Sequence, residues 1–553
     1  MASGGEASSY YNAGSQQPNY QYQQSQPNYG QYPPPQHGGD DPAKYGQEPP
    51  QYDHQGYGPY GYQPEGEKHS FDETFRIEKP KWNDLWAGIL VSLGDGYEIG
   101  EITGGIRNLI IVFAGYVVVS GIAIQGYAST KGFNGGGIYD GSNTFSLDTN
   151  TLVLFVFVLV VSFVLSYAYV WLARLFPKAF IWVTGILNII FGFATAIYML
   201  SRKYYSGGIV FLLFAIFTLI CFITWIKRIP FSALMLRTAV DVSKSYGHVY
   251  LVSLAGGIVA IAFGAWYSVT LVAIYVKYQP AADNPACSEG VGGCSQAKVI
   301  GLIVFVTFAM YWISEWIKNT IHTTIAGVYG SWYFCSANPP KGATRGALKR
   351  ATTYSFGSIS LGSLIVAIIN MLRQVCSVAQ RAEAAEGNIV GTILFCVLGC
   401  IIGILDWAVQ FLNRYAFCHI ALYGKSYVAA AKDTWRMIKD RGIDALINEL
   451  LIGPVLSMGA VFVAFACALM AYCYLIFTSP AYNSDGDYTP VVVAFAFLIG
   501  LQVCNIFTTP ISSGIETIFV ASAWDPEVLV RDHPDLYARM VSVYPRVQTA
   551  IHS

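Results

Sequence analysis

The sequence predicts an all-α polytopic membrane protein with about ten transmembrane helices and both termini in the cytosol. Long apolar runs without charge recur along the chain from about 109 to 523, each long enough to cross ~30 Å of hydrocarbon as a helix. Backbone polar groups in lipid must bond internally, so such runs favour helices over open strands. Basic residues gather in alternate links between the runs, which gives the chain an orientation.

The apolar runs define the spans in order. The run at 151–173 illustrates the pattern, because it holds no charged residue over more than twenty positions. The predicted spans lie at about 109–127, 151–173, 179–200, 207–226, 249–276, 299–321, 354–375, 389–412, 451–477 and 491–511. An even number of spans agrees with termini on the same side of the membrane.

The links between the spans differ in charge. The basic links contain Arg174 and Lys178; Lys227, Arg228, Arg237 and Lys244; Lys341, Arg345, Lys349 and Arg350; and Lys425, Lys432, Arg436, Lys439 and Arg441. The other links, at 131–150, 279–296 and 479–490, are rich in Gly, Asn and Asp, and Arg202 and Lys203 are the exception to the alternation. The positive-inside rule therefore places the basic links and both termini in the cytosol.

The two ends of the chain are predicted to be cytosolic tails. Residues 1–78 are rich in Tyr, Gln and Pro and almost lack aliphatic side chains, so no core offsets the cost of ordering and we expect disorder. Pro49, Pro50 and Tyr52 belong to a PPxY sequence, which in a polyproline II turn docks into WW-domain grooves. Such a motif would recruit a WW-domain ubiquitin ligase, whereas a chance match is the alternative. Residues 524–553 form the C-terminal tail.

A polar stretch interrupts the approach to the first span. Residues 79–108 form a juxtamembrane segment, and the part at about 91–109 carries Asp95, Glu98, Glu101 and Arg107 among several glycines. Its removal would join two apolar pieces into one long first helix. Two interpretations stay open: a retained intron or other gene-model error, and a genuine polar insert. The transmembrane transporter domain is predicted to cover 109–523.

The sixth span holds the first group of candidate substrate-binding residues. Ionisable groups inside a bilayer are costly and mark a pathway or a site by default. Helical spacing puts polar side chains on one face beside two indoles, and a carboxylate next to indoles suits a weakly hydrated cation. The candidates are Trp312, Glu315, Trp316, Asn319 and His322. The alternative is a structural pair of Glu315 with Lys318, with the tryptophans in an interfacial belt.

Other spans add weaker candidates. Asp406 follows an apolar run in the eighth span and either binds substrate or pairs with Arg414 two turns on. Trp266 and Tyr267 lie in the middle of the fifth span and either line a cavity or pack. Proline inside the last two spans, at Pro454 and Pro510, can interrupt a helix where it lines a cavity, as in many transporters.

Several classes of function are disfavoured by the sequence. The formal net charge of -1 and the lack of a basic patch give no case for nucleic-acid binding. No hydrolase, zinc-protease or P-loop motif occurs where it could act, so we expect no enzyme, no cofactor and no metal site. Cys287 and Cys294 lie in a Gly/Pro-rich link predicted to face outside, where two cysteines usually form a disulfide.

Long blocks of the sequence resemble a known family. The stretches YWISEWIKNTIHTTIAGVYGSWYF, GALKRATTYSFGSISLGSLIVAI and NRYAFCHIALYGKSYVAAAKDTW are similar to the choline transporter-like family. The Tyr/Gln/Pro-rich tail, KWND at 81–84 and GIYDG at 137–141 resemble its fungal, pH-nine-sensitive branch. The resemblance covers nearly everything from about 79 onward, and the polar stretch at 91–109 departs from it. It implies a multi-pass plasma-membrane protein that moves choline or a related organic cation by facilitated diffusion.

Two functions remain in competition at this point. The first is a carrier for a small organic cation in the lipid bilayer, with Glu315 balancing the charge and Trp312 and Trp316 holding the ammonium. The second is a membrane scaffold or trafficking protein that acts through its PPxY-containing tail. Deletion of residues 1–78 would abolish the second function and change only the surface abundance of a carrier.

Overall fold

The computed structural model describes residues 104–129, 149–203, 205–278, 280, 294–336, 339–478 and 489–543. In these ranges the regular elements are helices, and no strand occurs. Ten of the described helical segments are long and apolar enough to cross a membrane, which confirms the predicted fold class. The helices are α3 Gly104–Ser129, α4 Thr149–Leu175, α5 Pro177–Ser201, α6 Tyr205–Trp225, α7 Ile229–Ser245, α8 His248–Tyr278, α10 Gln296–Phe334, α11 Ala343–Thr352, α12 Phe356–Ala385, α13 Ile389–Tyr423, α14 Tyr427–Thr478, α15 Thr489–Trp524, α16 Pro526–Asp532 and α17 Pro534–Val543.

Several spans continue as helices well beyond the apolar runs in the sequence. The sixth span, predicted at about 299–321, is α10 and extends to Phe334. Its last turns are held by packing, because Ile325, Tyr329 and Tyr333 are fully buried. The polar residues at 316–324 therefore lie inside a continuous helix. Apolar content alone could not show this, because burial against neighbouring helices supplies the stability.

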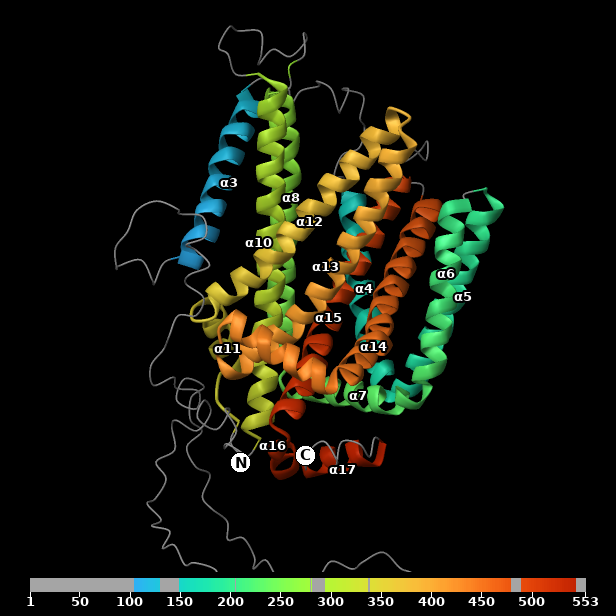
Figure 1. Ribbon diagram of the computed structural model, residues 1–553, viewed down its shortest axis with the longest axis vertical. Coiled ribbons are helices and arrows are strands. Elements are labelled where there is room, and N and C mark those ends of the chain that lie inside the picture. The colour runs from blue at the N-terminus through green and yellow to red at the C-terminus, as the bar shows by residue number, and fades with distance from the viewer. Residues whose placement is uncertain are drawn as a thin grey trace, which may run out of the picture.

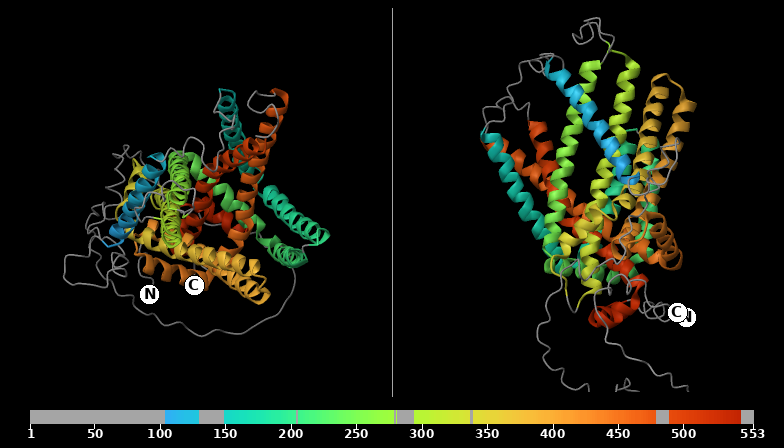
Figure 2. Two further views of the ribbon diagram at one scale, coloured as in Figure 1. Left: turned by 90° about the horizontal axis from the view of Figure 1, so that it is seen from above. Right: turned by 90° about the vertical axis from the view of Figure 1, so that its left-hand side faces the viewer.

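The helices form one bundle with α10 near its centre. Helix α10 packs against α3, α8, α12, α13 and α15, while α5 and α6 form a hairpin at the periphery (Figures 1 and 2). The outer faces are apolar, as Phe191, Phe217 and Phe477 are 69%, 63% and 85% exposed. Apolar side chains of this kind are suited to contact with lipid. A helix can lie there because its backbone N–H and C=O groups form hydrogen bonds within the helix.

Short helices gather at one end of the bundle. Helices α7, α11, α16 and α17 lie there, at the lower end of Figure 1. Helix α7 follows a 3₁₀ turn at Ile226–Arg228 and begins with proline in its first turn, a position that tolerates the missing N–H. Arg237, Lys244 and Lys349 belong to these helices, so basic links that the sequence groups together lie at a common end.

Glycine permits one of the closest helix contacts beside the site described below. A Cβ on Gly514 of α15 would come within 2.2 Å of the Tyr329 ring on α10. The Tyr329 hydroxyl donates a hydrogen bond to the backbone oxygen of Ala239 at 2.8 Å. The absence of a side chain at Gly514 thus lets Tyr329 join α10, α15 and α7 in one contact.

Two parts of the sequence analysis fall outside the described residues. The N-terminal tail with Pro49, Pro50 and Tyr52 is one, and most of the polar stretch at 91–109 is the other, although α3 begins within that stretch at Gly104. Cys287 also lies outside the described residues. Its pairing with Cys294 therefore stays a prediction.

Candidate functional site

A polar pocket of about 450 Å³ lies between α13, α14 and α15. Aliphatic and aromatic side chains, among them Leu456, Tyr415 and Phe519, make up the rest of its wall. Tyr415 and Phe519 meet edge to face with their ring centroids 6.0 Å apart. The polar residues of the lining are Arg414, Ser457, Asn505, Thr508, Thr509, Ser512 and Glu516. Polar groups in such numbers between membrane-spanning helices are expected where a solute is bound.

Proline marks both of the long helices that line the pocket. Pro454 lies inside α14, next to the pocket-lining Gly453, and Pro510 lies inside α15 between Thr509 and Ser512. A proline within a helix removes one backbone hydrogen bond and its ring crowds the preceding turn. Pro454 and Pro510 thus lie next to pocket-lining residues, but α14 and α15 continue through them, so the interruption that the sequence allowed does not occur.

Glu516 is the most deeply buried charged group of the pocket. Its side chain is 5% exposed, and its carboxylate Oε1 lies 3.8 Å from the Arg414 guanidinium and 3.2 Å from the Ser512 hydroxyl, which donates to it. Arg414 is the more accessible partner, with a side chain that is 41% exposed. Because an isolated carboxylate is costly to bury, the Arg414 guanidinium close by stabilises the ionised form of Glu516.

His322 of α10 joins this carboxylate to a third helix. Its Nε2 lies 3.0 Å from the backbone oxygen of Arg414, and its Nδ1 lies 2.9 Å from the Ser513 hydroxyl. A carbonyl oxygen only accepts hydrogen bonds, so in the neutral ring Nε2 carries the proton and Nδ1 accepts from Ser513. The Oε2 of Glu516 lies 3.5 Å from Nδ1. His322 therefore fixes α10 against α13 and α15 directly behind the pocket.

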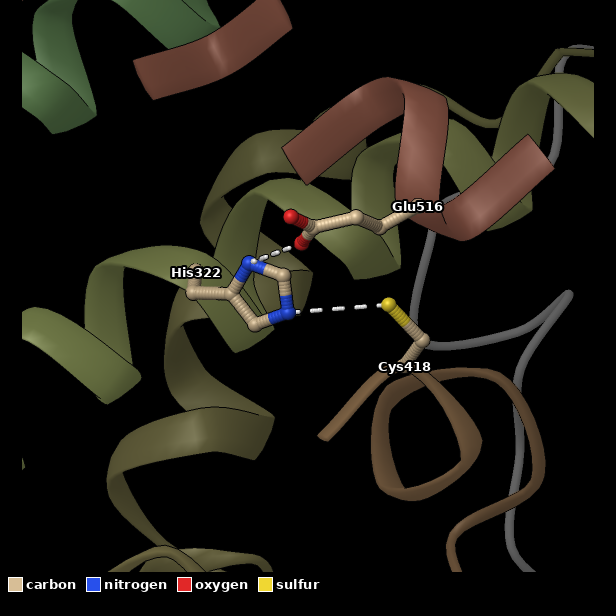
Figure 3. Close-up of side chains that lie close together, drawn as sticks. All are labelled: His322, Cys418 and Glu516. Carbon is tan, nitrogen blue, oxygen red and sulfur yellow. Dashed lines mark hydrogen bonds and ion pairs between the residues drawn. The ribbon is translucent and has the colours of Figure 1, made fainter. Parts of the chain in front are cut away.

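The group of His322, Cys418 and Glu516 deserves a test as a metal centre, since its ligand atoms lie within 4.8 Å of one another. Figure 3 shows Glu516 on the Nδ1 side of the imidazole and Cys418 on the Nε2 side. A histidine binds a metal ion through one ring nitrogen and donates the other to a carbonyl or carboxylate. The thiol and the carboxylate therefore lie toward different ring nitrogens, and one ion cannot take both without rearrangement. We interpret the group as an interhelical polar contact.

The tryptophans predicted on the sixth span face α12. The Trp312 indole donates a hydrogen bond to the backbone oxygen of Ser360 at 3.0 Å. Trp316 packs on Phe356 with 4.9 Å between ring centroids. Glu315 pairs with Lys318, whose Nζ lies 3.2 Å from Oε2. The Glu315–Lys318 pair matches the structural alternative for this group, whereas the tryptophans pack inside the bundle and do not form an interfacial belt. A role of the group in substrate binding stays a prediction.

The remaining predicted residues divide between interhelical contacts and packing. Asn319 donates to the Ser363 hydroxyl of α12 at 2.9 Å. Trp266 packs against Tyr116 of α3 at 4.8 Å, and the Tyr267 hydroxyl lies 3.1 Å from that of Thr307 on α10.

Asp406 has a different partner from the one considered in the sequence. It accepts a hydrogen bond from Gln410 at 2.9 Å and lies 3.8 Å from Arg373 of α12, whereas Arg414 lies beside Glu516. Of the predicted residues, His322 is thus the one in direct contact with the residues of the pocket.

Sequence reasoning missed Glu516. The predicted last span ended at about 511, so Glu516 lay beyond it, although inside the predicted transmembrane domain at 109–523, and was not among the candidate residues. The structure continues α15 through Pro510 to Trp524. A usable signal was present, because Glu516 is the one acidic residue of the apolar stretch at 491–523.

Comparison with known proteins places the chain in a family. Residues 209–527 match the family described as plasma-membrane choline transporter. The chain is 67% identical to Protein PNS1 of Gibberella zeae over 88% of this chain and 86% of the relative. It is 61% identical to Protein pns1 of Aspergillus fumigatus over 99% of each, and 42% identical to Protein PNS1 of Saccharomyces cerevisiae over 86% of this chain and 87% of the relative. The resemblance seen in the sequence is confirmed, and the chain belongs to the choline transporter-like family of membrane transporters.

Proposed function

We propose that the protein carries choline or a related small organic cation across the plasma membrane, with the pocket between α13, α14 and α15 as its binding site. The observation that carries the proposal is the buried carboxylate of Glu516 at a polar cavity. A cation that enters the cavity meets this charge and the rings of Tyr415 and Phe519. A carboxylate together with aromatic rings is the chemistry that binds ammonium groups.

Exchange of partners at Glu516 is central to the proposal. In the described state the carboxylate is balanced by Arg414 at 3.8 Å. Arg414 is accessible enough to move into water when a cationic substrate takes its place. The carboxylate then keeps a counter-charge in the loaded and in the empty carrier, which avoids the cost of an unpaired buried charge. Departure of the cation lets Arg414 return.

The prolines beside the pocket supply the movement that a carrier needs. Pro454 and Pro510 weaken the backbone ladders of α14 and α15 at the level of the pocket. The two helices also pack against each other. A bend at these positions would change which end of the bundle the pocket faces, as broken helices do in other transporters.

The basic end of the bundle is proposed to face the cytosol. Helices α7 and α11 carry the basic residues that the positive-inside rule assigns to that side. Glu516 lies about two turns before the end of α15 at Trp524. The binding site would therefore lie in the cytosolic half of the membrane.

Uptake of labelled choline into proteoliposomes that contain the purified full chain tests this function. We expect saturable uptake in the wild type and a loss of about tenfold or more in Glu516→Gln, which keeps the shape but removes the charge. Glu315→Gln is the matched control, because Glu315 is paired with Lys318 on α10 and does not line the pocket. Wild-type uptake by Glu516→Gln, together with loss in Glu315→Gln, would move the site to the sixth span.

A further inference from the structure

A second cavity, of about 710 Å³, lies on the other side of α15 and is lined by α4, α7, α8 and α15. Its floor is buried, with Val170, Val240 and Phe507 between 1% and 8% exposed. Its walls face outward, as Val160, Val164 and Leu251 are each more than half exposed. The cavity is therefore an apolar groove on the lateral surface of the bundle, and we call it the α4–α8 groove.

The length of the groove matches one leaflet of a bilayer. Its lining on α4 runs from Leu159 to Trp171, which corresponds to about 18 Å at the helical rise of 1.5 Å per residue. Half of the ~30 Å hydrocarbon core is close to this value. An apolar groove of that length on a lipid-facing surface is suited to a single acyl chain.

Aromatic packing gives the groove a defined shape. Phe507 of α15 lies at its floor, with its ring centroid 5.1 Å from that of Phe163 on α4 and 5.7 Å from that of Tyr250 on α8. The Tyr250 hydroxyl is hydrogen-bonded to Ser243 of α7 at 2.8 Å. The groove thus runs down to α7 between fixed side chains.

The lower end of the groove carries a positive charge. Lys244 lies there, near the C-terminal end of α7, together with Gly247 in the turn before α8. Lys244 is exposed, and no ion pair holds its ammonium within the described part of the chain. Asp241 of α7, one turn before Lys244, pairs instead with Arg174 of α4. A lysine at the end of an apolar groove can extend its ammonium to the headgroup level of the membrane.

We propose that the α4–α8 groove binds one anionic phospholipid, with an acyl chain along α4 and α8 and the net negative headgroup at Lys244. Hydrophobic burial of the chain would supply the affinity, and the ammonium of Lys244 would supply the preference for a net negative headgroup. This site is separate from the polar pocket. It does not depend on which solute the pocket carries.

A photoreactive acyl chain on phosphatidylserine or on phosphatidylcholine tests the site. Each lipid is added to the full-length protein in detergent, and the cross-linked peptides are mapped by mass spectrometry. We expect phosphatidylserine to label the peptides of α4 and α8 that line the groove, with weaker labelling by phosphatidylcholine. Equal labelling by both, or labelling elsewhere on the bundle, would overturn the proposal.

Matched variants distinguish the contribution of the headgroup to binding from that of the acyl chain. Lys244→Gln should lower labelling by phosphatidylserine about fivefold and leave that by phosphatidylcholine unchanged. Lys178→Gln is the control. Lys178 lies on α5 and is exposed like Lys244, but it does not line the groove. Val164→Trp should block labelling by both lipids by filling the groove. Unchanged labelling in Lys244→Gln, or displacement of both lipids by a sterol at equal concentration, would contradict an anionic phospholipid.

Discussion

The carboxylate of Glu516 and the guanidinium of Arg414 lie 3.8 Å apart at the wall of the polar pocket, one on α15 and the other on α13. Their surroundings are unequal, because the Glu516 side chain is 5% exposed and that of Arg414 is 41% exposed. The two members of the pair should therefore respond differently to substitution. This asymmetry gives a direct test of the pair.

Arg414→Gln should destabilise the protein by about 2 kcal/mol, because it leaves the buried carboxylate without its positive partner. Glu516→Gln should cost less, since the more exposed Arg414 can turn to water. The double variant should recover most of the loss of the Arg414→Gln single variant. Thermal unfolding of the three purified variants measures this, and additive losses in the double variant would mean that the two residues do not interact.

His322→Ala should also lower the unfolding temperature, because it removes hydrogen bonds to Ser513 and to the Arg414 backbone. A loss of about 2 kcal/mol is expected for two buried bonds. Zn²⁺ or a chelator should leave the unfolding temperature of the wild type unchanged. A rise with Zn²⁺ that disappears in Cys418→Ser would instead identify a metal centre.

Gly514→Ala should destabilise the bundle, because the added Cβ would come within 2.2 Å of the Tyr329 ring. Overpacking of this kind costs about 1–3 kcal/mol. Gly264→Ala is the matched control, since nothing lies within 4 Å of a Cβ at that position. Equal unfolding temperatures for the two variants would show that α15 yields at this contact.

Acidic pH should loosen the C-terminal helices α16 and α17. The ring of His533 packs against those of Trp332 and Tyr333, and its Nε2 is 2.9 Å from the Tyr333 backbone oxygen. Burial lowers the pKa of His533 below its usual value, against the opposing effects of that hydrogen bond and of Asp532. The neutral ring therefore favours docking above the unfolded pKa of about 6.5, and this contribution is lost as the pH falls below that value.

Hydrogen exchange over Pro526–Asp532 and Pro534–Val543 at pH 7.5 and pH 5 measures this effect. Exchange should be faster at the lower pH in the wild type. His533→Phe keeps the aromatic contacts without the titration, so its exchange should change less between the two conditions. If exchange in His533→Phe changed between the two pH values as much as in the wild type, titratable groups other than His533 would be responsible for the effect.

Transport should depend on the lipid in the α4–α8 groove, if both proposals hold. Val503, Ile506 and Phe507 face the groove, whereas Asn505 and Thr508 of the same turns face the polar pocket. Lys244→Gln should then lower choline uptake in vesicles that contain phosphatidylserine and leave it unchanged in vesicles of phosphatidylcholine alone. Equal uptake by wild type and variant in both vesicles would separate the groove from transport.

The number of spans and their order were predictable from the sequence, because charge-free runs such as 151–173 have the length of a bilayer. The binding pocket was only partly predictable. Pro454 and Pro510 were recognised as prolines that could interrupt a helix beside a cavity, but α14 and α15 continue through them. The predicted last span ended at about 511, so the sequence did not single out Glu516. Its helix continues because Ile515 and Phe519 are buried against the bundle, a contact between distant segments that no local pattern contains.

The partners of the sixth span were equally hidden from the sequence. Helical spacing grouped Glu315, Asn319 and His322 on one face. In the structure Asn319 meets Ser363 of α12, while His322 meets Ser513 of α15. Their positions differ only slightly in angle around the axis of α10, and this difference is enough to direct the two side chains to different helices. Which helix each side chain meets depends on the packing of the whole bundle.

Helix α10 offers a natural reference frame for watching this protein work. It extends over 39 residues without a proline, whereas α14 and α15 each contain a proline. It also packs against helices on several sides. Two probes placed at the ends of α10 should keep a constant separation through the transport cycle. The distance from a probe on α14 or α15 to those two probes can then be measured. A change in this distance reports bending of the proline-containing helices and does not depend on tumbling of the molecule.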